Sequence, residues 1–270
     1  MIRDSMVFAS WSSDRPGASV SHGTGVAAEQ GAGAGFEVAF VDRDGGERRM
    51  ALSQCWTVRF EQVPPVRGFA SFPGQSHFPG LWWFSSSGGH VGFESWLERD
   101  VVMSLDADPL VTAVASQPFW LSWPDGERLV RHAPDFFVRH RDGSAVVIDV
   151  RADDRIEDSD AAKFAATARA CAQAGWQYRR IGALDPVLAA NLRWLAGYRH
   201  PRFARSEFAE DLIGVFTRPR ALGDGALAVG DPLAVLPALF NLLWRKVLLA
   251  DIESVLLTSR SVVRAAGDER

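Results

Sequence analysis

The sequence has few cysteines and no long apolar run. Its two cysteines, Cys55 and Cys171, are too few for a disulfide framework or for a zinc site of their own. No apolar run reaches the roughly 18 residues that a transmembrane helix needs. The first residues lack the basic segment and apolar run of a secretion signal. We therefore expect a cytoplasmic protein without a membrane partner.

Net positive charge is also lacking. The formal net charge is -4, whereas a protein that binds nucleic acid alone, by neutralising phosphates, is usually basic. Any such contact is then confined to a local basic face or depends on a partner for affinity. The short basic clusters 139–141 and 199–202 could contact phosphates or could equally be solvated surface. The hydrophobic content of 47% is enough for one or two folded domains.

Composition divides the first third of the chain. Residues 1–35 are rich in Gly, Ala and Ser, and we expect them to be disordered. Residues 36–90 are expected to form an extension of strands and loops that packs on the next domain. Its strands are predicted in FEVAF (36–40) and CWTVRF (55–60). The stretch 63–89 is predicted to be a long ordered loop with packed aromatic residues: Phe69, Phe72, Phe78, Trp82 and Trp83.

Residues 91–201 show regular periodicity, and we predict an α/β core with a mixed sheet. The expected order is a helix, three strands, a helix, a strand and a helix. Their ranges are 92–106, then 111–123, 128–140 and 144–151, then 161–175, 176–182 and 186–198. Residues 202–270 are expected to form a separate unit, with helices in 206–218 and 231–252 and a short strand pair in 253–266. This is the outline of a winged helix.

Acidic residues in the core are spaced as metal-assisted phosphodiester hydrolysis requires. Carboxylates hold a hard cation such as Mg²⁺, which polarises the phosphate, and a nearby positive side chain stabilises developing charge. Asp135 precedes the hairpin turn RDG, and Asp149 and Arg151 follow that turn on one strand, two residues apart. Residues two apart on a strand project from the same face. Glu98 lies on the preceding helix and supplies a third acid.

Each acid has a structural alternative. Asp149 follows the apolar run VVI in a strand expected to be buried, and burial of a charge is costly unless the group is paired or binds a metal. We favour a metal ligand over an ion pair with Arg151 or His132. Asp135 could simply begin a strand. Glu98 could be a solvated helix position, and Glu94 is the competing candidate ligand.

Two segments carry a resemblance to a known family. The run FESWLERDVVMSLDADPLVTAVASQP (93–118), followed by HAPDFFVRHRDGSAVVIDVR (132–151), resembles the TnsA-like endonuclease subunits of heteromeric transposases. The run FPGLWWFSSSGGHVGFESWLERD (78–100) is similar to the actinobacterial branch of that family. The resemblance covers residues 60–202. It implies a PD-(D/E)XK nuclease core, a mixed sheet flanked by helices, with a small, mainly helical, winged-helix-like unit at the C-terminus.

The resemblance also assigns roles to residues. In that family the acid on the first helix lies about nineteen residues before a Gln, which indicates Glu98 rather than Glu94 when counted from Gln117. The acid of the PD motif corresponds to Asp135, and the (Glu/Gln)-x-Lys triplet corresponds to residues 149–151. The implied metal ligands are Glu98, Asp135 and Asp149, holding Mg²⁺ or Mn²⁺. Gln117 is either a polar strand residue or a residue that lines the site, and we favour a supporting role at the site.

The triplet departs from the family pattern in two ways. Asp149 has a side chain one methylene shorter than Glu or Gln. Arg151 replaces Lys, and a planar guanidinium with a very high pKa is not equivalent to an ammonium group. It can stabilise phosphate charge but is a poor proton shuttle. Lys163, on the following helix, is a candidate for a displaced lysine.

We therefore consider three functions. The first is a metal-dependent DNA endonuclease subunit that nicks DNA at mobile-element ends, and the resemblance implies a DDE-type transposase and an AAA+ regulator ATPase as partners. The acidic net charge fits this dependence. The second is a catalytically reduced subunit whose nuclease fold binds DNA or the transposase. The third is a stand-alone restriction-like or repair nuclease.

Overall fold

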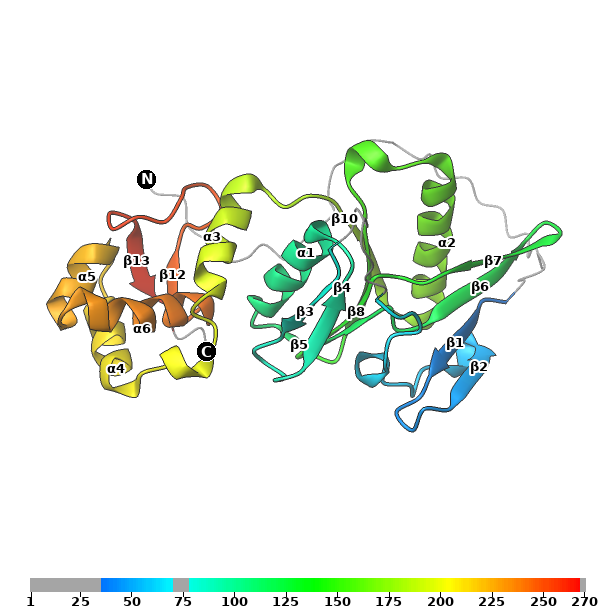
Figure 1. The fold of residues 1–270 in the computed structure, drawn as a ribbon, viewed down its shortest axis with the longest axis horizontal. Helices are drawn as coiled ribbons and strands as arrows, with labels where there is room; N and C mark the ends of the chain where they lie inside the picture. Colours follow the sequence, from blue (N-terminus) through cyan, green and yellow to red (C-terminus); the bar gives the residue numbers. More distant parts are fainter. Residues whose placement is uncertain (1–34, 70–77, 268–270) are drawn as a thin grey trace, which may run out of the picture. The chain divides into compact units, whose positions relative to one another are not determined.

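Four antiparallel strands from two separate parts of the chain form the first sheet. The computed structural model describes residues 35–69 and 78–267, and most of the segment expected to be disordered therefore lies outside the described residues. Figure 1 shows the elements. The sheet order is β2-β1-β6-β7, and the strands are β1 (Glu37–Val41), β2 (Glu47–Ala51), β6 (Trp120–Asp125) and β7 (Arg128–His132). The β1–β2 hairpin thus pairs with a hairpin from the middle of the sequence.

The second strand predicted for the extension is wrong. Residues 55–60 form a turn and the start of η2 (Phe60–Gln62), after η1 (Leu52–Gln54), whereas β2 occupies the charged run ERRMA. Phe60 is fully buried, and its ring packs against four other rings: Phe40, Phe119, Phe137 and Trp176. The apolar signal of CWTVRF therefore marks the anchoring of single side chains. The polar run ERRMA forms a strand because β1 supplies its hydrogen-bonding partner.

A mixed sheet forms the centre of the predicted core. Its order is β10-β9-β8-β5, with strands β5 (Val111–Ser116), β8 (Phe136–His140), β9 (Ala145–Val150) and β10 (Gln177–Ile181). Strands β9 and β10 are parallel, and the other pairs are antiparallel. The helices α1 (Trp96–Asp106) and α2 (Asp158–Ala174) cover opposite faces, because Val146 and Ile148 pack in one cluster with α1 while Ala145 and Val147 pack in another with α2.

Two of the predicted strands are each divided between the two sheets. The run 111–123 breaks at Gln117 into β5 and β6, and the run 128–140 breaks at residues 133–135 into β7 and β8. Gln117 has a φ of 44°, in the left-handed region, and Pro118 and Pro134 cannot donate to a strand ladder. The β6–β7 hairpin consequently leaves the core sheet and pairs with β1 (Figure 1).

The predicted loop 63–89 contains a strand, which was missed. The strands β3 (Gly80–Trp83) and β4 (His90–Phe93) form an antiparallel hairpin. Helix α1 therefore begins at Trp96, later than predicted, where Ser95 accepts a hydrogen bond from the Glu98 N–H as the N-cap. Among the aromatic residues of this stretch, Phe72 lies outside the described residues. Trp82 packs against the core.

The second half of the core follows the prediction closely. Helix α2 starts with a capping box at Glu157, and Gly175 ends it with a φ of 71°. A short turn, η3 (Asp153–Arg155), precedes it. Helix α3 (Pro186–Ala196) has Asp185 as its N-cap, with Pro at the first helical position. These local signals fix the ends of both helices.

The C-terminal unit contains three helices and a small sheet. After η4 (Pro201–Phe203) come the helices α4 (Ser206–Val215), α5 (Leu222–Val229) and α6 (Pro232–Trp244). The antiparallel sheet order is β11-β13-β12, with strands β11 (Arg220–Ala221), β12 (Leu248–Ala250) and β13 (Val262–Ala265). The predicted helix 231–252 is too long, since Lys246 adopts a φ of 59° and 248–250 form a strand. This strand, and not one from 253–258, is the partner of β13.

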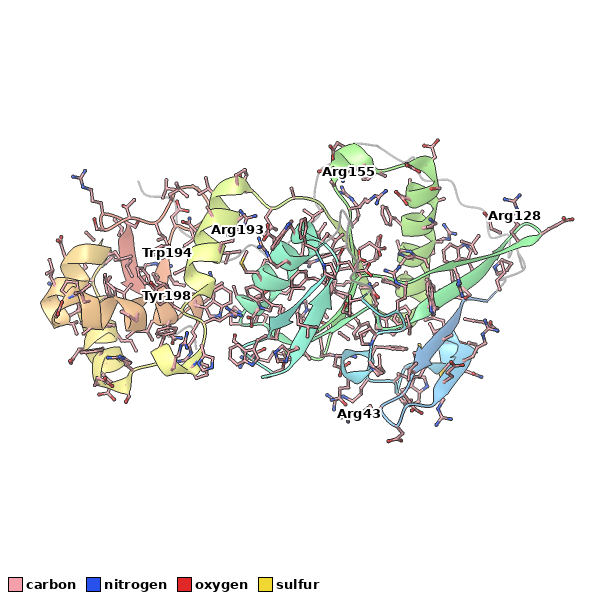
Figure 2. All side chains as sticks on the ribbon, in the orientation of Figure 1. Arg43, Arg128, Arg155, Arg193, Trp194 and Tyr198 are labelled. Carbon is pink, nitrogen blue, oxygen red and sulfur yellow. The ribbon has the colours of Figure 1, made fainter. Side chains whose placement is uncertain are left out.

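One hydrophobic cluster joins α1 and α3 to the C-terminal helices. It contains Met103 of α1 and Leu192 of α3 together with Leu239 of α6. Arg193 of α3, labelled in Figure 2, donates to the buried Asp100 carboxylate of α1. Across residues 35–69 and 78–267, no helix has the length and apolar character needed to span a membrane.

Candidate active site

Asp135 and Asp149 face each other across neighbouring strands. The register of β8 and β9 pairs Phe136 with Ile148, so the next pair outward is Asp135 with Asp149. Opposite residues of an antiparallel pair lie on the same face. The Val150 N–H donates to Asp135 Oδ2 at 2.7 Å, which fixes the Asp135 side chain against β9. The structure therefore brings these two predicted acids together.

The same row continues across the sheet on both sides. The Gln117 N–H donates to the Asp135 carbonyl at 2.8 Å, one step beyond the β5–β8 ladder. On the other side, Arg180 of β10 is the register partner of Asp149. One level across the sheet thus contains the two acids in the middle, flanked by Gln117 and Arg180. Gln117 and Asp135 lie just beyond the ends of their strands.

Asp149 is almost fully buried, at 1% exposure, and both of its oxygens have partners. His132 Nε2 lies 2.7 Å from Oδ1, and the Tyr178 hydroxyl donates to Oδ2 at 2.8 Å. His132 reaches this position because β7 ends beside the start of β8. Of the two ion-pair partners considered for Asp149, the structure places His132 there and not Arg151.

The Asp135 carboxyl lies in a negative environment. Burial, and then the charges of Asp149 and Glu98, raise its pKa well above the usual range, while the hydrogen bond from Val150 and the charge of Arg67 act in the opposite direction. The arrangement favours binding of a proton or a cation at Asp135.

Glu98 adjoins this pair, but its oxygens cap helix α1. Its Oε1 accepts from the Ser95 hydroxyl at 2.9 Å and its Oε2 from the Glu94 N–H at 2.8 Å. Burial raises the pKa of the Glu98 carboxyl. Glu94 binds Arg67 instead, at 2.9 Å. Glu98 is therefore the glutamate whose carboxylate accepts hydrogen bonds at the helix N-terminus and whose charge raises the pKa of Asp135, whereas Glu94 is paired with Arg67.

The two predicted cations lie around a different acid. Arg151 Nη2 is 3.0 Å from Asp160 Oδ2, and Arg151 Nε donates to the carbonyl of Arg155, a residue labelled in Figure 2. Lys163 Nζ lies 4.0 Å from the other oxygen of Asp160. Asp160 is in the first turn of α2, so this helix holds both cations at one carboxylate.

Sequence reasoning missed two side chains of the site, Tyr178 and Arg67. Alternation along WQYRRIG places Tyr178 and Arg180 on one face of β10, which is a signal that a search for buried partners could have used. Arg67 has no such signal. Its Nε donates to Gln117 Oε1 at 3.3 Å across fifty positions of sequence, and no spacing rule connects two residues so far apart.

The positions of the acidic side chains do not by themselves define a metal site. Within the described part of the chain, no group of three or more His, Cys, Asp and Glu side chains is arranged to hold one. Mg²⁺ commonly uses only one or two carboxylates together with water and phosphate oxygens. Asp135 and Asp149 supply that number, and the negative environment of Asp135 is of the kind that a divalent cation relieves. The donor set fits Mg²⁺ on these terms.

Comparison with known proteins adds a family to this geometry. A search of curated proteins finds no match. Residues 108–181 match the family model described as TnsA-like endonuclease N terminal. The matched segment contains Gln117, Asp135 and Asp149, and it begins after Glu98. The match supports a TnsA-like nuclease family for this part of the chain, and with it a nuclease function of the transposase type on a mixed α/β fold.

Proposed function

We propose that the chain is a metal-dependent DNA endonuclease subunit of a heteromeric transposase, which nicks DNA at mobile-element ends by hydrolysing a phosphodiester bond. One observation carries the proposal. The β8–β9 pairing ends with Phe136 opposite Ile148, which places Asp135 and Asp149 together one step further along, inside the segment that matches an endonuclease family.

Asp135 and Asp149 would hold Mg²⁺ or Mn²⁺, with Glu98 as the third acid. The ion, when bound, polarises the scissile phosphate and lowers the pKa of a bound water. The chain's own groups prepare the site. His132 and Tyr178 fix the Asp149 carboxylate in one orientation, and the Val150 N–H fixes that of Asp135. Preorganised carboxylates need no rearrangement when substrate arrives.

Arg151 would contribute positive charge near the scissile phosphate once it leaves Asp160. Their ion pair is partly exposed, with 44% of the Arg151 side chain accessible. Pairs of this kind contribute only about 0–1 kcal/mol, so a DNA phosphate could compete with Asp160 for the guanidinium. Lys163, held by the same acid, would be released together with it.

The proposed partners are a DDE-type transposase and an AAA+ regulator ATPase. The net charge of -4 supports dependence on such partners for DNA affinity. We also propose that residues 202–270 form a winged-helix-like unit, which the helices α4–α6 and the β11-β13-β12 sheet support. Helix α6 has the apolar sequence PLAVLPALFNLLW, without a basic side chain. Because most of α6 is buried in the hydrophobic cluster, this helix offers no phosphate contact of its own.

A catalytically reduced subunit is the second candidate. It is favoured because both oxygens of Asp149 and the guanidinium of Arg151 already have protein partners. In that case the fold would serve to bind DNA or the transposase without cleaving it.

A nicking assay on supercoiled plasmid carrying mobile-element ends separates these functions. The chain is supplied with Mg²⁺ or Mn²⁺, with and without its partner subunits. Under the proposal, Asp135→Ala abolishes nicking and leaves partner binding intact, whereas Asp125→Ala, at the exposed tip of the β6–β7 hairpin, has no effect. If the wild-type protein does not nick DNA with its partners present and with either metal, the proposed enzyme activity is refuted. Nicking without any partner instead indicates a stand-alone nuclease.

A further inference from the structure

The loop that precedes β3 extends the active-site row by one more strand position. The Val66 N–H donates to the Gln117 carbonyl at 2.9 Å. Since Gln117 itself bonds to the Asp135 backbone, the segment around residue 66 lies directly beside the level of the two acids. The side chain that follows it, Arg67, is therefore carried to the edge of the site by backbone hydrogen bonds.

Two polar side chains hold the Arg67 guanidinium in place. Its Nη2 donates to Glu94 Oε2 at 2.9 Å and its Nε to Gln117 Oε1 at 3.3 Å. The side chain nevertheless remains 40% exposed. The charge of Arg67 lowers the pKa of both Asp135 and Glu98, so it acts on the acid cluster itself. Arg67 is thus fixed, open to solvent and next to the catalytic carboxylates.

Gln117 shows that this arrangement is maintained at a cost. Its backbone adopts a left-handed φ of 44°, a conformation that is strained for a non-glycine residue. Its side chain is 1% exposed, and its Nε2 has no hydrogen-bond partner among the described residues. A buried donor without a partner is a further destabilising feature. Strain and an unsatisfied donor meet at the residue that orients Arg67.

We propose that Arg67 is a second arginine, besides Arg151, that binds a DNA phosphate at the acid pair, with Gln117 and Glu94 as its positioning residues. This inference rests on the proposed nuclease function and adds a substrate contact to it. The guanidinium fork suits phosphate oxygens. Arg151, by contrast, is held by Asp160 of α2. Arg67 would supply positive charge at the acids from a separate loop, whether or not Arg151 leaves Asp160.

The test measures DNA binding, which does not depend on cleavage. Binding of the full chain to a short labelled duplex is followed by fluorescence anisotropy over a range of salt concentrations, with Ca²⁺ in place of Mg²⁺. Each phosphate contact contributes about 0.9 to the slope of log K against log salt. Arg67→Ala is expected to weaken binding and to reduce the slope by about 0.9, whereas Arg67→Lys keeps the slope.

Arg128→Ala is the matched control. It removes one positive charge from the exposed tip of the β6–β7 hairpin, so an effect of net charge alone predicts the same loss as Arg67→Ala. Our proposal predicts an unchanged slope. Arg67→Gln, which is neutral and still hydrogen-bonds, replaces the alanine variant if thermal denaturation shows that the latter is unfolded.

Three results would overturn the inference: an unchanged slope in the neutral Arg67 variants, an equal loss in Arg128→Ala, or no duplex binding by the wild type at low salt. The proposed function fails separately. If the wild type never nicks DNA but Arg67→Ala reduces the salt slope, the proposed nuclease activity is refuted and the proposed phosphate contact of Arg67 is supported.

Discussion

The hydroxyl of Tyr178 offers a sharp test of the site that does not depend on activity. It donates to Asp149 Oδ2 at 2.8 Å, and Asp149 is 1% exposed, so water cannot replace it freely. Tyr178→Phe removes this one oxygen and keeps the ring that packs in the cluster under α2. Because the acceptor is a buried acid, we expect a loss of about 1.5–3 kcal/mol in the free energy of unfolding.

The chain contains its own control for this substitution. It has two tyrosines. The second is Tyr198, a residue labelled in Figure 2, whose backbone carbonyl accepts from Asn241 and whose hydroxyl has no hydrogen bond among the described residues. Tyr198→Phe should therefore change the free energy by less than about 0.5 kcal/mol. Both variants are measured by urea denaturation in EDTA, since a bound metal would stabilise the folded state and obscure the difference. The slope of free energy against urea should not change.

A double-mutant cycle tests the pairing directly. If Tyr178 acts through Asp149, its substitution should cost much less in an Asp149→Ala background, with a coupling energy of about 0.5–3 kcal/mol. Additivity within about 0.5 kcal/mol would refute the reasoning. So would a Tyr178→Phe protein that is no less stable than Tyr198→Phe.

Two further predictions concern the surroundings of the site. Phe60→Ala should destabilise the protein by about 3–5 kcal/mol, because Phe60 is fully buried among the rings that join the extension to the core. Thermal denaturation compares this variant with Trp56→Ala, whose side chain is 82% exposed. Equal destabilisation by the two substitutions would contradict the prediction. Asp160→Asn should cost less than about 1 kcal/mol yet tighten duplex binding in the anisotropy assay, because Arg151 and Lys163 lose their shared partner. Asp154→Asn, an exposed neighbour, removes the same charge without freeing either cation, and a gain of equal size in that variant would show that only net charge matters.

The amino-acid sequence determined the elements whose signals are local. Asp185-Pro186 and Gly175 mark helix ends through hydrogen bonds and dihedral angles that span a few residues. The hairpin turn RDG sets the spacing between Asp135 and Asp149, so their approach could be predicted from chain order alone. The family match includes this same segment.

Only the tertiary structure decided which groups surround the acids. The β6–β7 hairpin, once separated from the core strands, pairs with β1, which lies far away in the sequence. That division carries His132 to Asp149, and the loop before β3 carries Arg67 to Gln117. The alternation that predicted Arg151 beside Asp149 did not include the competing charge of Asp160 on α2. Local patterns fix where a strand or helix can form, but contacts between distant segments depend on which of them share a buried face, and this is set by packing of the whole chain.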